Sequence, residues 1–390
     1  MNSGKPTLLI LGTRGIPASH GGFETFAERL ALFLVDRGWH VVVYCQKEVA
    51  RVETRFHSNY WQGIERIDVA VSSTGPRATL EFDWHCVRHA ATRDGVCLVL
   101  GYNGAVFLPY LRFKGRKIVI NMDGIEWRRA KWNFSIQTWF WMNEWIAAWS
   151  SHRLIADNPV IADHLATRRG RSATAMIPYG GDSITSAPEA SVYALGLEPR
   201  RYFISIARIE PENNILLMVQ AFSRQRRGVK FAVLGNLDDS IPYHVAVREA
   251  AGEEVVFPGA IYDKAVIGAL RFHARAYLHG HTVGGTNPSL VEALGAGNAV
   301  IAHDNAYNRW TAGPGAFFFK GIDECDRLFD RLLIDDVGVA RSQLAARARA
   351  AEAFRWTDIL TAYENEFVAL YGKPTEQPQA ARQAGTATWR

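Results

Sequence analysis

The sequence predicts an α/β fold of two tandem domains, each with a mainly parallel sheet, and a ligand cleft between them. Short apolar runs alternate with helical segments, which is the pattern of parallel strands joined by crossover helices. The pattern fades near the middle of the chain and then restarts. A length of 390 residues suits two domains of about 100–200 residues better than one. Because such folds bind ligands outside the carboxyl ends of their strands, we expect the site between the two sheets.

The individual elements follow from periodicity. The segment 24–37 predicts a helix, because Phe26, Leu30 and Leu34 recur at helical spacing and Gly38 can end it. Apolar runs predict strands in the first half at 7–11, 40–45, 96–100, 117–121 and 153–156. In the second half they predict strands at 202–207, 230–234, 254–257, 276–278 and 299–302, and helices at 214–226, 263–272 and 288–295.

The domain boundaries follow from a change in composition. Residues 183–200 are rich in Ser, Ala, Pro and Glu and lack periodicity, so we interpret them as a linker. This divides the chain into an N-terminal domain at 1–185 and a C-terminal domain at 186–355. A last helix at 356–372 carries large aromatic residues and is expected to cross back to the N-terminal domain. The tail at 373–390 has no apolar face, so we expect it to be flexible.

Composition excludes several protein classes. The 12 Trp, 13 Tyr and 20 Phe provide ample core material, which excludes disorder over most of the chain. The longest apolar stretches, such as 105–111, are far shorter than the ~18 residues of a membrane span. The first residues do not resemble a secretory signal, and the four Cys form no CxxC pair. We therefore expect a cytoplasmic protein with reduced thiols.

Charge is distributed unevenly. Residues 1–185 hold 22 Lys and Arg against 16 Asp and Glu, whereas residues 186–390 hold 22 against 23. A basic first domain suggests an acidic ligand or an anionic membrane surface near it. A solvated basic surface without a partner is the alternative.

Two glycine-rich segments connect strands to helices. The first, from Gly12 to Glu24, does not match GxGxxG, which disfavours a nicotinamide-binding fold. Its glycines and the following helix start can bind an oxyanion, although a tight loop without a ligand is the alternative.

The second glycine-rich segment runs from Gly280 to Glu292. Asn287 can cap the following helix and Pro288 suits its first position. The amides of Ser289 and Leu290 are then expected to face a phosphate, and Glu292 to reach a sugar hydroxyl. A capped core helix without a ligand remains the alternative.

Other segments carry charged groups at predicted strand ends. Arg208 can neutralise a diphosphate with forked hydrogen bonds. Asp123 and Glu126 can hold or deprotonate a hydroxyl, although Asp123 can equally cap a helix. Six Trp lie between 127 and 149, beside Arg128, Arg129 and Lys131. This mixture suits a membrane interface, with aromatic core packing as the alternative.

Metal and nucleophile motifs are not found in the sequence. It contains no Asp-x-Asp, no metal-ligand spacing of His or Cys and no Gly-x-Ser-x-Gly elbow. We therefore expect neither a metal nor a cofactor.

Together these motifs resemble the retaining nucleotide-sugar glycosyltransferases of family 4, and more closely the rhamnosyltransferase-like branch of bacterial polysaccharide biosynthesis. The resemblance covers about residues 7–372 and rests on Gly12–Thr25, Asn121–Trp127, Arg208–Asn214 and Gly280–Glu292. It implies the GT-B architecture of two Rossmann-like domains. The N-terminal domain would bind the acceptor, and the C-terminal domain the nucleotide-sugar donor.

The resemblance also implies roles for individual residues. The implied catalytic residues are Asp123, which stands where the family often has a His, Glu126 and His281. Arg208, Gly21 and Gly22 would contact the donor diphosphate, as would the Ser289 and Leu290 amides. Glu292 would hold the ribose. The sugar pocket would include His281, Gly285, Thr286 and Asn287.

Two positions depart from the family pattern. Asn213 stands where a Lys that binds the diphosphate is usual, and it is counted among the donor-binding residues. Gly284 stands where a Glu that contacts donor hydroxyls is usual. A deoxy-sugar donor such as dTDP-L-rhamnose fits the missing Glu, and both departures also occur in the rhamnosyltransferase-like branch.

The function implied is transfer of a sugar, with retention, to a hydroxyl of a saccharide acceptor in cell-surface polysaccharide or O-antigen synthesis. The partners implied are a nucleotide-sugar donor and a saccharide or lipid-linked saccharide. The inner face of the plasma membrane is a candidate attachment surface, and no nucleic acid is expected. A nucleotide-sugar 2-epimerase and a non-catalytic nucleotide-sugar or polysaccharide-binding protein remain as alternatives.

Overall fold

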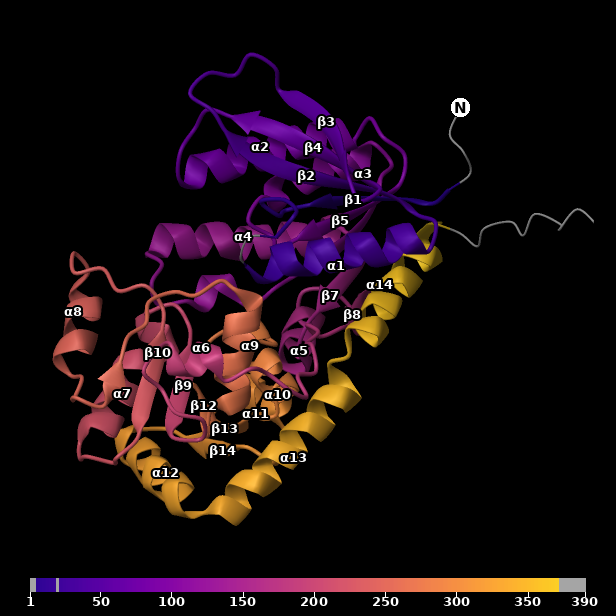
Figure 1. Cartoon of the computed structure of the whole chain (residues 1–390). Helices are drawn as coiled ribbons and strands as arrows, with labels where there is room; N and C mark the ends of the chain where they lie inside the picture. The colour runs from indigo at the N-terminus through magenta and orange to yellow at the C-terminus, as the bar shows by residue number, and fades with distance from the viewer. Residues whose placement is uncertain (1–4, 19–20, 372–390) are drawn as a thin grey trace, which may run out of the picture.

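Two α/β units, each built on its own sheet, make up the protein (Figure 1). The computed structural model describes residues 5–18 and 21–371. The predicted fold class is confirmed, because almost every strand pair is parallel and helices cover both sheets. The tail predicted to be flexible, 373–390, lies outside the described residues.

The first sheet has the strand order β3-β4-β2-β1-β5-β6-β7-β8, and only the β3–β4 pair is antiparallel. Its central strands are apolar on both faces, as expected for strands covered by helices on both sides. The strands are β1 (Thr7–Leu11), β2 (His40–Glu48), β3 (Phe56–Trp61), β4 (Ile64–Val71), β5 (Val96–Leu100), β6 (Lys117–Asn121), β7 (Arg153–Ala156) and β8 (Thr174–Met176).

Helices cover this sheet on both faces. On one side α1 packs with the last helix of the chain, and the other side carries the remaining helices. The helices of this unit are α1 (Gly22–Asp36), α2 (Pro76–Ala90), α3 (Leu108–Phe113), α4 (Phe134–Ser150) and α5 (Pro159–Ala166).

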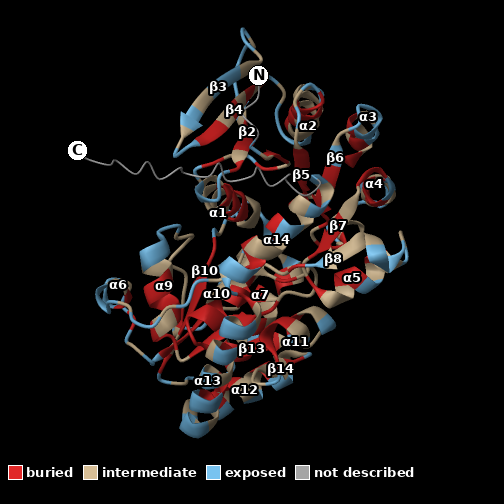
Figure 2. Cartoon of the chain, turned by 90° about the vertical axis from the view of Figure 1, so that its right-hand side faces the viewer, coloured by how far each residue is buried: buried red, intermediate tan, exposed pale blue. Residues whose placement is uncertain are grey.

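The second sheet is parallel throughout, with the order β11-β10-β9-β12-β13-β14. Its central strands, like those of the first sheet, form the buried layer in Figure 2. They are β9 (Tyr202–Ile206), β10 (Lys230–Leu234), β11 (Val255–Val256), β12 (Ala276–His279), β13 (Ala299–His303) and β14 (Phe317–Phe319). The helices here are α6 (Ala190–Tyr193), α7 (Ile215–Ser223), α8 (Pro242–Glu249), α9 (Lys264–His273), α10 (Pro288–Gly295), α11 (Ala306–Ala312), α12 (Ile322–Ile334) and α13 (Asp336–Ala353).

The last helix, α14 (Trp356–Tyr371), lies beside α1 of the first unit (Figure 1). Tyr363 stacks on Phe26 at 4.7 Å between ring centroids, and its hydroxyl accepts a hydrogen bond of 2.7 Å from the Asn121 side chain. The chain therefore passes between the units twice. The two crossings lie side by side, since the Gly181 amide donates to the Phe354 carbonyl at 2.8 Å. The domain boundaries at 185 and 355 stay predictions.

Several elements escaped the sequence analysis. The hairpin β3–β4 is an edge of the sheet, and β3 is mostly exposed with polar residues, so it lacks an apolar run. Helix α13 is rich in Ala and Arg and has little amphipathic pattern. Strands β8 and β14 are only three residues long. Helices α2 and α12 are amphipathic, yet they are not among the helices predicted from the sequence.

Candidate active site between the two sheets

The loop between β1 and α1 is tightly built. Gly12 has φ 79°, and a Cβ there would lie 2.3 Å from the Leu100 carbonyl oxygen, so the position requires glycine. The Glu24 carboxylate accepts hydrogen bonds from the Thr13 hydroxyl at 3.3 Å and the Arg14 amide at 3.0 Å. Gly21 is the N-cap of α1 and, as a glycine, has no side chain with which to cap the helix. The start of α1 therefore presents amides without a side-chain cap.

A cavity of about 280 Å³ lies next to this helix start, between the two sheets. We call it the interdomain cavity. It brings together four of the predicted site residues, Gly22, Asp123, Arg208 and Thr286. The rest of its lining is Phe23, Phe26, Asn121, Asp157, Pro178, Tyr179, Pro288 and Tyr363. The expected cleft at the carboxyl ends of the strands is thus present, and α14 contributes to its wall.

Two carboxyl groups lie in this cavity, and only one was predicted. Asp123 comes just after β6 with φ 52°, and its amide donates to the Asn121 side chain at 2.9 Å. Asp157 comes just after β7. Sequence reasoning missed Asp157, although its position at a strand end is the signal that selected Asp123.

The pKa values of both carboxyl groups are raised. Burial raises the pKa of Asp123, while the Arg129 and Arg208 guanidinium groups oppose this effect. Burial, and then the negative charge of Asp123, raises the pKa of Asp157 to about 7. One oxygen of Asp157 accepts from the Thr286 amide at 2.9 Å, and the other is buried without a hydrogen-bond partner among the described residues. Asp157 can therefore donate or accept a hydrogen bond inside the cavity near neutral pH.

Glu126 does not line the cavity. Its carboxylate pairs with Arg129 at 2.8 Å, and its pKa is raised to about 6 by burial and then by the charge of Asp123. Arg129 also pairs with Glu212 at 2.5 Å, and Lys131 pairs with Glu210 at 3.4 Å. These pairs join the two domains. Arg129 and Lys131 therefore contact the second domain, instead of forming the free basic surface that the sequence suggested.

His281 lies close to this site, but its surroundings disfavour the protonated, cationic ring that could donate a proton. Its ring stacks on His279 at 4.2 Å, and its Nδ1 is buried without a hydrogen-bond partner among the described residues. Burial, and then the charges of Arg208 and Arg129, lowers the pKa of His281 to about 3. The ring is therefore neutral at pH 7.

Arg208 occupies the most informative position. It follows β9, its side chain is 68% exposed, and it pairs with Glu210 at 3.1 Å. It lines the interdomain cavity and also a cavity of about 580 Å³ within the second domain. We call the latter the C-domain cavity, lined by Ile206–Pro211, Leu234, Gly235, Asn236, Ile241, Tyr243, His244, Ala260, Ile261 and Tyr262. One guanidinium group thus stands where two cavities meet.

Asn213, predicted to contact the donor, supports this loop instead. Its side chain is buried and donates to the Arg208 carbonyl at 2.9 Å. The carboxamide therefore holds the backbone that carries Arg208 and is not directed at either cavity.

The start of α10 differs from the expectation. Asn287 caps the helix as predicted, because its side chain accepts from the Ser289 amide at 3.0 Å. The Leu290 amide donates to the Asn287 carbonyl at 3.1 Å, and Leu290 is fully buried. Both amides assigned to a phosphate are thus engaged within the turn. They are therefore not free in this structure, because the cap that identifies the helix start also satisfies its donors, and their contact with a phosphate stays a prediction.

The remaining predicted residues have other surroundings. A Cβ at Gly285 would lie 2.0 Å from the Asp157 carboxylate, so this glycine makes room for Asp157. At Gly21 a Cβ would lie 2.2 Å from Glu24. Glu292 pairs with Arg271 at 2.6 Å and lines a separate cavity of about 130 Å³, which shares Tyr179 with the interdomain cavity.

Comparison with known proteins gives the context for this arrangement. A family model described as "Domain of unknown function (DUF1972)" matches residues 5–182. No curated protein matches the chain. Among solved structures, the chain is similar to sucrose-phosphate synthase from Thermosynechococcus elongatus, with a TM-score of 0.75 at 17% identity, covering 94% of this chain and 99% of that one.

Two further structures have the same arrangement of domains. Anabaena HepE in complex with UDP and glucose has a TM-score of 0.72 at 17% identity, covering 93% of this chain and all of that one. A glycosyltransferase from Rickettsia africae has a TM-score of 0.68 at 12% identity, covering 95% and 100%. The chain has the GT-B fold. In this fold the two Rossmann-like domains face each other across the interdomain cavity.

Within the described residues of this GT-B chain, no three His, Cys, Asp or Glu side chains are grouped as metal ligands. Over the same residues, no helix has the length and apolar character needed to cross a bilayer.

Proposed function

We propose that the protein transfers a sugar from a nucleoside-diphosphate donor to a hydroxyl group of a saccharide acceptor. The observation that carries this proposal is the position of Arg208 at the junction of two cavities. A diphosphate held there would place its nucleoside in the C-domain cavity and its sugar in the interdomain cavity. The HepE structures in complex with UDP and glucose and with UDP-glucose support this class of donor.

The chemistry follows from charge. As the bond between the anomeric carbon and the phosphate oxygen breaks, negative charge grows on the diphosphate. Arg208 and the uncapped start of α1 stabilise that charge. The acceptor oxygen bonds to the anomeric carbon on the face that the phosphate leaves, and its proton passes to the departing phosphate. Configuration is therefore retained without a protein nucleophile.

Asp123 and Asp157 have a positioning role in this scheme. Both lie in the cavity proposed for the sugar, and the raised pKa of Asp157, about 7, lets it hold a sugar hydroxyl as donor or acceptor. Of the three predicted catalytic residues, Asp123 is the one that lines this cavity. Glu126 pairs with Arg129, and a neutral His281 lies near enough to Arg208 to feel its charge.

The donor sugar proposed is L-rhamnose, carried by dTDP, for cell-surface polysaccharide or O-antigen synthesis. The support is Gly284, where no carboxylate is present to bind a donor hydroxyl, and where a Cβ would meet no atom within 4 Å. A sugar that lacks a hydroxyl loses little from the absence of this partner.

The test is a donor screen followed by product analysis. Thermal shift and calorimetry with UDP-glucose, GDP-mannose and dTDP-L-rhamnose should show the largest stabilisation with the rhamnose donor. Incubation of that donor with a saccharide acceptor should release dTDP and form a retained glycoside. A sugar product that forms without any acceptor would contradict transfer and support the 2-epimerase. Donor binding without any turnover would support the non-catalytic alternative.

We also propose that the protein attaches peripherally to the inner face of the plasma membrane, where a lipid-linked acceptor would lie. The support is helix α4, which buries polar side chains and exposes large apolar ones. Its buried side includes Asn143 and Glu144, whereas its exposed side carries Phe134, 83% exposed, and Trp149, 64% exposed. Phe113 on neighbouring α3 is 85% exposed. Such a surface, with Lys114 and Arg128 close to it in the sequence, suits an anionic membrane.

Co-sedimentation with liposomes tests this attachment. We expect recovery with anionic vesicles and little with neutral ones, and a clear loss when Phe134 and Trp149 are both replaced by Ser. The matched control replaces Ile334 and Val337, which are equally exposed on the second domain, and should bind as the wild type does. Equal recovery with both lipids, or none with either, would contradict the proposal.

A further inference from the structure

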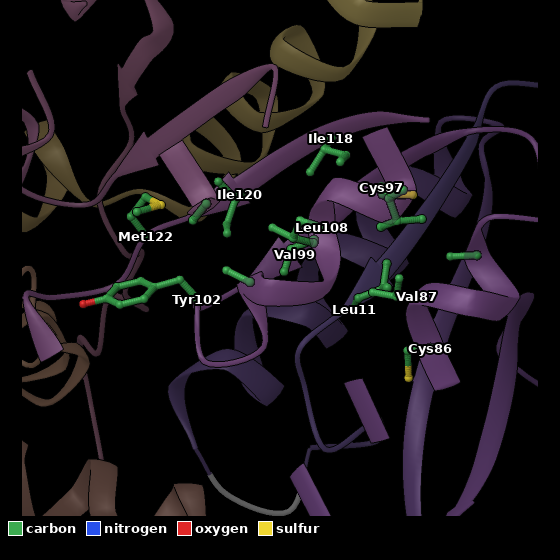
Figure 3. Close-up of a cluster of buried hydrophobic side chains, with 14 of the residues drawn as sticks. Leu11, Cys86, Val87, Cys97, Val99, Tyr102, Leu108, Ile118, Ile120 and Met122 are labelled. Atoms are coloured by element: carbon green, nitrogen blue, oxygen red, sulfur yellow. The ribbon is translucent and has the colours of Figure 1, made fainter. Parts of the chain in front are cut away.

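Strand β3 is a long, open edge of the first sheet. Strands in the centre of this sheet, such as β5 and β6, are paired on both sides and carry buried side chains, among them Val99 and Ile120 (Figure 3). Of the four edge strands in the described residues, β8 and β14 have three residues each and β11 has two. By contrast, β3 has six residues, and Figure 2 shows it as the outermost strand of the first domain. Short edges resist pairing with another chain, and β3 lacks this protection.

The register of the β3–β4 pair shows which backbone groups of β3 point outward. Just before β3, the Ala70 amide donates to the Arg55 carbonyl at 3.0 Å, across the same antiparallel register. In such a pair every second residue bonds to the neighbouring strand, and the residues between them direct their N–H and C=O groups away from it. The outward residues of β3 are therefore Phe56, Ser58 and Tyr60. Among the described residues no hydrogen bond engages their outward backbone groups.

The composition of β3 also offers no protection against pairing. Proteins commonly guard a long edge strand with charged side chains, with Pro or with a β-bulge. The strand reads Phe-His-Ser-Asn-Tyr-Trp, with no Lys, Arg, Asp, Glu or Pro. Its register against β4 runs without interruption from Phe56 to Trp61, so it contains no bulge. An exposed aromatic side chain, Tyr60 at 70%, adds apolar surface to this edge. The edge therefore has the properties of a strand that pairs with another chain.

A second copy of the same strand complements this edge. A two-fold axis at Ser58 places two antiparallel β3 strands so that Ser58 faces Ser58 of the partner subunit, and Phe56 faces Tyr60 of the partner subunit. Each of these pairs exchanges both of its hydrogen bonds, because all the residues in them face outward. Phe56 and Tyr60 lie on the same face of the strand, where Phe56 packs on His89 of α2 at 4.6 Å between ring centroids. Opposed aromatic side chains stabilise a strand pair and no like charges oppose each other, so this register suits both backbone and side chains.

We propose that the protein forms a two-fold symmetric dimer through antiparallel pairing of β3 with β3 of a second copy. The two 8-stranded sheets then join into one continuous sheet. Strand β3 is five strand positions from β6, a distance of about 24 Å at ~4.8 Å per strand. The interface therefore does not use the residues after β6 and β7 that line the interdomain cavity. This inference does not depend on the proposed glycosyl transfer.

Sedimentation velocity of the full chain over a range of concentrations tests this proposal. We expect a monomer–dimer equilibrium that Ser58→Lys weakens by about tenfold or more, because it opposes two ammonium groups at the two-fold axis. Tyr60→Lys, which removes the opposed aromatic pairs, should also weaken the dimer. Ser58→Pro removes an outward N–H group and leaves the hydrogen bonds to β4 in place. The matched control is Met176→Lys on β8, the short edge at the other side of the same sheet, where the side chain is 42% exposed. It should dimerise as the wild type does.

Amide hydrogen exchange at low and high protein concentration locates the interface. The outward amides of β3 should be protected only at concentrations where the dimer is populated. A chain that stays monomeric throughout would overturn the proposal, and so would a dimer that Ser58→Lys leaves unchanged, since it would use another surface. Protection of these amides in the monomer would show that another segment of the chain covers the edge, and would equally overturn the dimer. Circular dichroism checks that each variant is folded. If the Ser58 variants do not fold, Tyr60→Lys decides, because it changes a mostly exposed side chain.

Discussion

The helices α1 and α10 both begin at the interdomain cavity, yet their first turns are built differently. Helix α10 has an Asn cap and Pro at its first position, and its early amides are satisfied within the turn. Helix α1 begins at Gly21, which provides no side-chain cap. A strong capping motif therefore marks a helix end that is already satisfied. The weaker motif, built from glycines, leaves amides for a ligand.

The largest effect is expected from removing the positive charge of Arg208, which lines the interdomain cavity together with these two helix starts. Arg208→Ala should weaken dTDP binding by about 1.5–3 kcal/mol, the range for hydrogen bonds to charged groups. Isothermal calorimetry measures this change. Arg226→Ala is the matched control, since Arg226 is an exposed arginine of the same domain paired with Glu253. Unchanged affinity in a folded Arg208→Ala protein would remove the basis of the donor site.

A smaller effect is expected at Asp157, which follows β7 and accepts a hydrogen bond from the Thr286 amide in the loop before α10. Its folded pKa of about 7 lies above the ordinary value of 3.8. The folded state therefore holds the proton more tightly, and this contribution to stability is lost as pH rises from about 4 to about 7. Asp157→Asn keeps an acceptor for the Thr286 amide and removes the titration. Relative to wild type, the variant should gain about 2 kcal/mol in urea unfolding between pH 5 and pH 8. A constant difference across this range would contradict the assignment.

The Asn287 cap of α10 tests the comparison between the two helix starts more directly. Asn287→Ala should lower the free energy of unfolding by about 1 kcal/mol, while dTDP affinity stays within error. Asp263→Ala, which removes the cap of α9, should cost about the same in denaturant unfolding. A loss of affinity at Asn287 as large as that at Arg208 would return the phosphate site to α10.

For removal of divalent cations we expect no effect on turnover. If Arg208 and the α1 amides neutralise the leaving diphosphate, turnover should continue at an unchanged rate in excess EDTA. The sequence has no Asp-x-Asp motif to hold a catalytic cation. A rate that falls with EDTA and recovers with Mg²⁺ or Mn²⁺ would show that a metal, and not the helix start, carries the charge.

The sequence predicts the central strands well because each is a short apolar run between turns. β5, β6, β7 and β10 begin and end at the predicted residues. Arg208, Asp123 and Gly22 are correctly expected at the cleft, because strand ends and glycine loops of parallel sheets meet at one edge.

What could not be predicted depends on contacts between distant segments. Nothing in the local sequence tells that Glu292 pairs with Arg271, or that Arg129 reaches Glu212 in the other domain.

The paired crossings between the domains have a mechanical consequence. A single linker would leave the domains free to twist and swing, but here two neighbouring strands of backbone are joined at Gly181 and Phe354. Two adjacent connections permit rotation of one domain relative to the other about a single axis, and they resist rotation about other axes. If the protein is the transferase proposed above, opening of the cleft to release the nucleotide and closure on the next donor would follow the same axis. Each closure would then restore the same alignment of donor and acceptor.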